Sequence, residues 1–275
     1  MWDFYDFKRQ AKGCLPIGAV LTIAAAGSEM SQSSVITNEN GWVKRGYSSN
    51  YCRPVFAVMD PELTMTLPLY QTACGCVDIL MHTMERYFNH SGSMEITDGI
   101  AEALMQTVIR NALIVMQHPN DYNARAEIMW AGSLSHNGLT DCGCDHGDWA
   151  THKMEHELGG LFDVAHGAGL AAIWGSWARY VCDADYARFA RFATKVLNVA
   201  PQATDKETAL AGIDAMEQFY HSIQMPTSLR ELGISPTEEQ LQEMARKCIL
   251  ATNGPAGKVK PLHQNDVENI YRAAL

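Results

Sequence analysis

The spacing of apolar residues along the chain changes character near residue 61. Before that point, short apolar runs and alternating stretches typical of strands fall at 17–23, 33–37, 42–47 and 54–60. The segment Asn38-Glu39-Asn40-Gly41 is a turn signal between the second and third of these runs. The pattern therefore predicts a β-rich segment over residues 1–61.

After Pro61 the apolar positions recur with the period of a helix, and no convincing alternating run follows. We predict helices at 67–88, 96–117, 122–134, 148–158, 167–181, 184–197, 206–223, 237–250 and 263–274. The fourth is expected to end at Gly159-Gly160, because glycine is typical of helix C-termini. The predicted fold class is mainly α, with a small β-rich portion over 1–61 and an all-helical part over 62–275.

Composition and charge narrow the class of protein. A content of 47% hydrophobic and 19% charged residues is typical of a globular chain rather than a disordered one. The net charge of −10 repels phosphate, so we expect no nucleic-acid partner. Residues 1–12 lack an apolar signal core, and no run of eighteen uncharged apolar residues follows, which predicts a cytoplasmic protein without membrane contact. The eight cysteines are then expected as reduced thiols, and Cys-Gly-Cys at 74–76 and 142–144 is too closely spaced for the usual zinc pairs.

Asp78 and His82 are the first residues that point to chemistry. They stand four apart in a predicted helix and therefore share one face of it. Taken alone, the pair is as typical of a solvated carboxylate–imidazole contact as of a metal site. Its neighbours, among them Val77, Ile79 and Leu80, are apolar, and burying a carboxylate among them is costly without a counter-charge.

A second cluster contains His152, Glu155, His156 and His166. One interpretation uses His152-x-x-Glu155-His156, which matches the pattern of inverted zinc proteases with the glutamate as the base. The other combines both clusters, so that Asp78, His82 and His166 bind one metal together with one or both of the earlier histidines. Any single histidine here could also be an ordinary core or surface residue, and the local spacing leaves these alternatives open.

Several stretches together carry a resemblance to a known family. They are LTIAAAGSEM at 21–30, VMDPELTMTLP at 58–68, Asp78 to His82, HKMEHELGGLFDVAHGAG at 152–169 and MPTSLRELG at 225–233. In order, spacing and identity the chain resembles the iron-containing, or group III metal-dependent, alcohol dehydrogenases over nearly all of its 275 residues. The similarity is strongest to the branch of NADPH-dependent butanol dehydrogenases and aldehyde reductases.

This resemblance implies a metal, Fe²⁺ or Zn²⁺, held by Asp78, His82, His152 and His166. It places His156 beside the metal, where it would relay a proton or orient the nicotinamide. In such enzymes the metal polarises the oxygen of a small alcohol or aldehyde while NADP(H) or NAD(H) exchanges the hydride. The zinc-protease alternative leaves Asp78, His82 and His166 without a role.

The resemblance also implies what surrounds the metal domain. The family's glycine-rich Gly-Gly-Gly-Ser turn does not occur here, so we expect residues 1–61 to be a remnant of an α/β, dehydroquinate synthase-like nucleotide-binding domain. In the relatives Gly27, Ser28 and Glu29 line the cofactor cleft, and Ala26 stands where many of them have threonine. An alternative hypothesis is a truncated fragment that binds metal but neither binds the cofactor nor turns over. Exposed strand edges then predict a homodimer or larger homo-oligomer.

Overall fold

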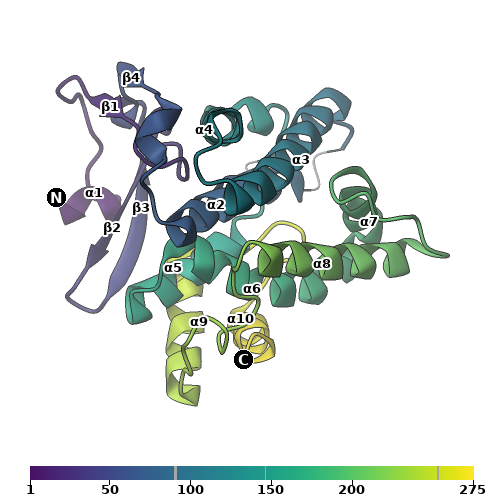
Figure 1. The fold of residues 1–275 in the computed structure, drawn as a ribbon. Coiled ribbons are helices and arrows are strands. Elements are labelled where there is room, and N and C mark those ends of the chain that lie inside the picture. Colours follow the sequence, from purple (N-terminus) through teal and green to yellow (C-terminus); the bar gives the residue numbers. More distant parts are fainter. Residues whose placement is uncertain (90–91, 146, 253) are drawn as a thin grey trace.

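The computed structural model describes residues 1–89, 92–145, 147–252 and 254–275 and consists mainly of helices (Figure 1). In the view of Figure 1 the strands lie together beside the helical body, next to the N-terminus. Both the helical fold class and the small β portion predicted from the sequence are confirmed. The described helices are α1 (Trp2–Tyr5), α2 (Leu69–Tyr87), α3 (Glu95–Gln117), α4 (Tyr122–His136), α5 (Ala150–Phe162), α6 (His166–Val181), α7 (Tyr186–Lys195), α8 (Asp205–Ser222), α9 (Glu238–Thr252) and α10 (Gln264–Ala273).

The β portion contains two separate pairs of strands. β2 (Ser33–Asn38) and β3 (Val43–Ser48) form an antiparallel hairpin whose register runs from Ser33 opposite Ser48 to Asn38 opposite Val43. The turn signal at 38–41 therefore connects the strands that it predicts. β1 (Gly18–Val20) and β4 (Phe56–Val58) pair in parallel over three residues each, so the runs at 17–23 and 54–60 give shorter strands than predicted.

The helix α2 lies at the centre of the helical body. Its residues from Thr72 to Met81 are all buried, and the helix packs against α3, α4 and α6. Two glycines permit the closest approaches: a Cβ at Gly75 would lie 2.2 Å from the carbonyl oxygen of Ala24, and one at Gly167 of α6 would lie 2.1 Å from that of Cys74. The backbone of α2 is thus in direct contact with the loop after β1 and with the first turn of α6.

The end of α5 differs from the prediction. The helix continues through Gly159-Gly160 to Phe162, and Asp163, in the left-handed region with φ 52°, follows it. The glycines allow close contacts instead of ending the helix: a Cβ at Gly160 would approach the carbonyl oxygen of Trp42 to 3.1 Å, and one at Gly159 would lie 2.7 Å from Glu155 Oε1. The prediction was wrong because glycine is favoured both at helix ends and where backbones meet.

The helix α3 is, by length and composition alone, long and apolar enough to cross a membrane. Glu102 and Arg110 interrupt its apolar sequence, and Met105, Val108 and Val115 are fully buried in the protein core. A core helix of a globular protein has these same properties, so α3 is weak evidence for a membrane span.

Candidate metal centre

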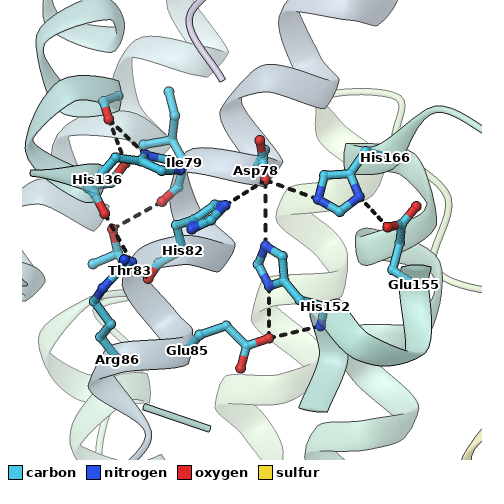
Figure 2. A network of polar contacts seen from close by, with 12 residues as sticks. Asp78, Ile79, His82, Thr83, Glu85, Arg86, His136, His152, Glu155 and His166 are labelled. Carbon is cyan, nitrogen blue, oxygen red and sulfur yellow. Dashed lines mark hydrogen bonds and ion pairs between the residues drawn. The ribbon is translucent and has the colours of Figure 1, made fainter. Parts of the chain in front are cut away.

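The centre of the candidate site is the carboxylate of Asp78. Its Oδ1 lies 3.5 Å from Nε2 of His82, 3.7 Å from Nε2 of His152 and 3.5 Å from Nε2 of His166. Figure 2 shows the three imidazoles turned toward this one oxygen from α2, α5 and α6. The structure therefore brings together two segments about seventy residues apart, as the second sequence interpretation requires.

Three helices place these side chains. Asp78 and His82 lie one turn apart on α2, which is buried in the core. His166 is the first residue of α6, and it reaches Asp78 because Gly167 lets the first turn of α6 lie against α2. His152 lies in the first turn of α5, and this helix begins directly after Trp149, whose backbone is left-handed with φ 62°. Such strained backbone at a non-glycine residue is concentrated at functional sites.

Glu85 holds the beginning of α5. Its Oε1 accepts hydrogen bonds from the backbone N–H and from Nδ1 of His152, at 3.0 and 2.9 Å, and its Oε2 accepts one from the backbone N–H of Trp149 at 2.6 Å. Because Nδ1 of His152 donates to this carboxylate, Nε2 is the ring nitrogen that faces Asp78 (Figure 2). A carboxylate in this position fixes both the tautomer and the orientation of a metal-binding histidine.

The electrostatics of the cluster favour a positive charge next to Asp78. Burial raises the pKa of Asp78, but the contact with His152 and the charges of the surrounding histidines outweigh it, so the pKa lies below its usual value. Burial lowers the pKa of His152, yet its contacts with Asp78 and Glu85 raise that pKa to about 9. Burial, together with the neighbouring His136 and His152, holds the pKa of His82 well below its usual value. A positive charge next to Asp78, either the protonated His152 ring or a metal ion in its place, is therefore favoured.

The donor set fits a divalent metal. A tetrahedral site with metal–ligand distances of 2.0–2.2 Å separates its donors by about 3.3 to 3.6 Å. The three distances from Asp78 Oδ1 are close to this range. One donor atom each of Asp78, His82 and His152 also lies within 4.8 Å of the others. Among the described residues Asp78 Oδ1 and His152 Nε2 are buried without a hydrogen-bond partner, which is costly unless something else satisfies them.

Two neighbours of the site were missed in the sequence. Glu85 stands seven residues after Asp78 and three after His82, so its helical spacing could have revealed it. His136 at the end of α4 has its ring centroid 3.8 Å from that of His82, and burial lowers its pKa to about 4. Its position gave no signal, since no other ligand-type residue stands at helical spacing from it on α4.

The remaining predicted residues surround this cluster. The His156 ring centroid lies 5.9 Å from that of His166, and burial lowers the pKa of His156 to about 3. Gly27 has φ +56°, and a Cβ there would collide with the His136 ring at 2.4 Å, so this loop lies directly against the histidine cluster. Ser28 is exposed, whereas Glu29 is buried and accepts a 2.5 Å hydrogen bond from the Ser133 hydroxyl of α4.

The cysteines lie outside the candidate site. Burial raises the pKa of Cys74 to about 11 and that of Cys76 to about 12, which favours the neutral thiol. Across the described part of the chain all eight cysteines are free, and the one cluster with metal-ligand spacing contains none of them. Their interpretation as reduced thiols is consistent with this arrangement.

Comparison with known proteins shows the family. Residues 72–275 match the model of the C-terminal region of the Fe-containing alcohol dehydrogenase family, and residues 1–61 match that of iron-containing alcohol dehydrogenase. The chain belongs to the iron-containing alcohol dehydrogenase family. This membership confirms the resemblance noted in the sequence.

Individual members of the family agree with this result over most of their length. NADH-dependent butanol dehydrogenase A of Clostridium acetobutylicum is 37% identical over 98% of this chain and 69% of its own length. NADPH-dependent aldehyde reductase YqhD of Escherichia coli is 34% identical over 82% of this chain and 58% of its own length. The crystal structure of NADH-dependent butanol dehydrogenase A from Thermotoga maritima superposes with a TM-score of 0.93 at 36% identity, covering 99% of this chain and 69% of that one.

The chain is accordingly an oxidoreductase of the alcohol dehydrogenase and aldehyde reductase type, from a family that uses a metal and a nicotinamide cofactor. The zinc-protease alternative has no support. In the structure Glu155, its proposed base, is hydrogen-bonded to His166, and His156 lies beside His166 rather than next to Asp78.

Proposed function

We propose that Asp78, His82, His152 and His166 hold the catalytic metal of this alcohol dehydrogenase. The observation that carries the proposal is the convergence of three Nε2 atoms on one carboxylate oxygen at 3.5–3.7 Å. One carboxylate and three imidazoles suit Fe²⁺ and Zn²⁺ alike, so we propose that either ion supports the site. A bound divalent cation supplies a Lewis acid for the alcohol or aldehyde oxygen.

The chain's own residues prepare the site for this chemistry. Asp78 contributes the negative charge, Glu85 keeps the lone pair of His152 Nε2 directed at it, and the buried helices exclude water around it. We assign His156, beside His166, to proton relay or to orientation of the nicotinamide. Burial keeps this imidazole neutral, so that it can accept a proton or a hydrogen bond.

We further propose that the loop of Gly27, Ser28 and Glu29 contributes to the cofactor cleft. Gly27 brings the backbone against His136, and Glu29 anchors the loop to α4 through Ser133. Ser28 remains exposed and free to face a ligand. The names of the relatives include both NADH- and NADPH-dependent enzymes, so NAD(H) and NADP(H) are both candidates. Residues 1–61 are proposed as the part of the nucleotide-binding domain present here, and residues 62–275 as the metal domain.

For assembly we propose a homodimer or larger homo-oligomer. The short sheet of β1 and β4 leaves apolar side chains in solvent, among them Val20 and Phe56, which are 60% and 61% exposed. A surface of this kind favours self-association. Light scattering that finds a monomer would refute this assignment. Free thiols suit the cytoplasm, which we propose as the location.

The experiment for the metal centre compares His166→Ala with wild type and with His221→Ala as a matched control. His221 is a half-exposed histidine of α8 paired with Glu231, away from the cluster. Metal content, and oxidation of a short alcohol with NAD⁺ and with NADP⁺, are measured separately for each protein. We expect His166→Ala alone to lose metal and turnover. Wild-type metal content and turnover in that variant would refute the proposal.

A further inference from the structure

Glu155 of α5 has an unusual environment for a carboxylate. It is completely buried, and its Oε2 accepts hydrogen bonds from Nδ1 of His166 and, at 3.4 Å, from Nζ of Lys44. Both of its described partners, one of them the ammonium group of Lys44, contact the same oxygen.

The surrounding backbone leaves room for this carboxylate and for little else. A Cβ at Gly159, one turn along α5, would lie 2.7 Å from Glu155 Oε1, and one at Gly169 of α6 would lie 3.2 Å from the same atom. The Gly159 Cβ would also approach Nζ of Lys44 to 3.0 Å. Two glycines from two helices thus form a slot that restricts the rotation of the Glu155 side chain.

Lys44 reaches the slot from outside the helical body. It belongs to β3, and the next residue of that strand, Arg45, forms a 2.7 Å ion pair with a second buried carboxylate of α5, Glu157. The hairpin is thereby joined to α5 by two neighbouring ion pairs. Only the Lys44–Glu155 pair also contacts a proposed metal ligand, because Glu155 is hydrogen-bonded to His166. Glu157 has no described contact with a histidine.

We propose that Glu155, held in place by Lys44, is a positioning residue that orients His166 for metal binding. The proposal rests on the metal centre described above. A carboxylate that accepts from Nδ1 leaves Nε2 unprotonated and directed at Asp78, as Glu85 does for His152 on the other side (Figure 2). His166 is the most exposed of the four proposed ligands, with 29% of its side chain accessible. Packing therefore restrains its ring least, and its orientation depends most on a hydrogen-bond partner.

The test compares two matched pairs of variants. Glu155→Gln and Glu157→Gln each replace one buried carboxylate of α5 that is ion-paired with the hairpin. Lys44→Met and Arg45→Met each remove the cation of the corresponding ion pair. Affinity for Zn²⁺ is measured by competition with a chromophoric chelator on the full chain. The ¹⁵N shift of His166 Nδ1 in the Zn²⁺ form reports its protonation and hydrogen bond.

We expect Glu155→Gln to weaken Zn²⁺ binding about tenfold to a hundredfold, as is typical for partners of metal ligands, and to move the His166 Nδ1 shift. Lys44→Met is expected to weaken binding by about threefold to tenfold, because it acts through one further residue. Lys44→Arg keeps the positive charge and should retain most of the wild-type affinity for Zn²⁺. Glu157→Gln and Arg45→Met should stay within about twofold of wild type, although they too lose an ion pair.

The outcomes separate this inference from the metal centre itself. Wild-type protein that binds no Zn²⁺ would overturn the metal centre and this proposal together. Wild type that binds Zn²⁺, with Glu155→Gln and Lys44→Met indistinguishable from their controls, would overturn the positioning role alone. If Glu155→Gln does not fold, Lys44→Met against Arg45→Met decides the question. Lys44→Met added to Glu155→Gln should cause no further loss, since Lys44 acts through Glu155.

Discussion

Replacing Glu85 with glutamine tests how the proposed site is held, because this one carboxylate supports both His152 and the start of α5. Glu85 is 2% exposed. Its two oxygens accept from two hydrogen-bond donors of His152 and from the backbone N–H of Trp149. Glutamine has the same size and shape but only one acceptor oxygen. The substitution therefore removes acceptors and charge without leaving a cavity.

The magnitude follows from the geometry. In the less costly orientation of the glutamine amide, its oxygen still accepts from His152 and its NH₂ group faces the backbone N–H of Trp149. That N–H donates to Glu85 at 2.6 Å in the wild type and has no acceptor in the variant. One hydrogen bond to a charged group is then lost, a loss of about 1.5 to 3 kcal/mol. Removing the negative charge from the N-terminus of α5 costs about 0.5 to 1 kcal/mol more. We expect a total destabilisation of about 2 to 4 kcal/mol.

The assay is urea unfolding of the metal-free protein followed by circular dichroism, together with Zn²⁺ affinity by chelator competition. Glu85→Gln should also weaken the affinity about tenfold to a hundredfold, because the His152 ring is no longer held by a charged acceptor. Glu102→Gln is the control: Glu102 is buried and bonded to Tyr87 and Arg191, away from the metal centre. The control should lose stability and keep its affinity. A Glu85→Gln protein with the stability and affinity of wild type would refute the reasoning.

Three further predictions concern the rest of the molecule. Arg188→Met should lower the free energy of unfolding by about 3 to 5 kcal/mol in urea titrations and leave Zn²⁺ affinity unchanged. It removes the cation that bonds the buried Asp98 at 2.5 and 2.6 Å and leaves that carboxylate only Arg191, at 3.6 Å. Equal stability would contradict this. Gly167→Ala should destabilise by about 1 to 3 kcal/mol or more, since its Cβ would strike a backbone carbonyl at 2.1 Å, while Gly99→Ala, with open space on α3, should stabilise by about 0.5 to 1 kcal/mol. Burial raises the pKa of Cys76 to about 12, so at pH 8 only about one molecule in ten thousand carries the thiolate. Alkylation followed by mass spectrometry should modify the exposed Cys14 and spare Cys76 until the protein unfolds, and equal labelling of both would show that Cys76 is accessible.

The helices could be predicted because an apolar stripe on a helix repeats along the sequence itself. α3, predicted at 96–117 and observed at Glu95–Gln117, shows how closely such a stripe marks its own ends. Gly159 and Gly160 misled the prediction for α5, because two of their close neighbours, Lys44 and the Trp42 carbonyl, depend on how the hairpin docks. A residue pattern within one segment contains no information about a partner in another.

In the candidate site, too, the sequence predicted pairs within one helix but not contacts between helices. Spacing placed Asp78 with His82 and His152 with His156, which are pairs within single helices. His166 lies next to Asp78 because α6 packs against α2, and the sequence offered it as one of two open alternatives. The family resemblance rather than the spacing favoured His152 over His156 as its companion. The proximity of His136 to His82 arises between α4 and α2 and had no counterpart in the sequence pattern.

The ion pairs between the hairpin and α5 have a consequence for the order of folding. Lys44 and Glu155 are 111 residues apart, and Arg45 and Glu157 are 112 apart. Contacts this distant carry a large loop-closure entropy and form late, whereas the pairing of β2 with β3 and the turns of α5 are local and form early. We therefore expect the surroundings of His166 to be completed only when two separately formed pieces of chain dock, so that the proposed metal centre matures after the local elements have formed.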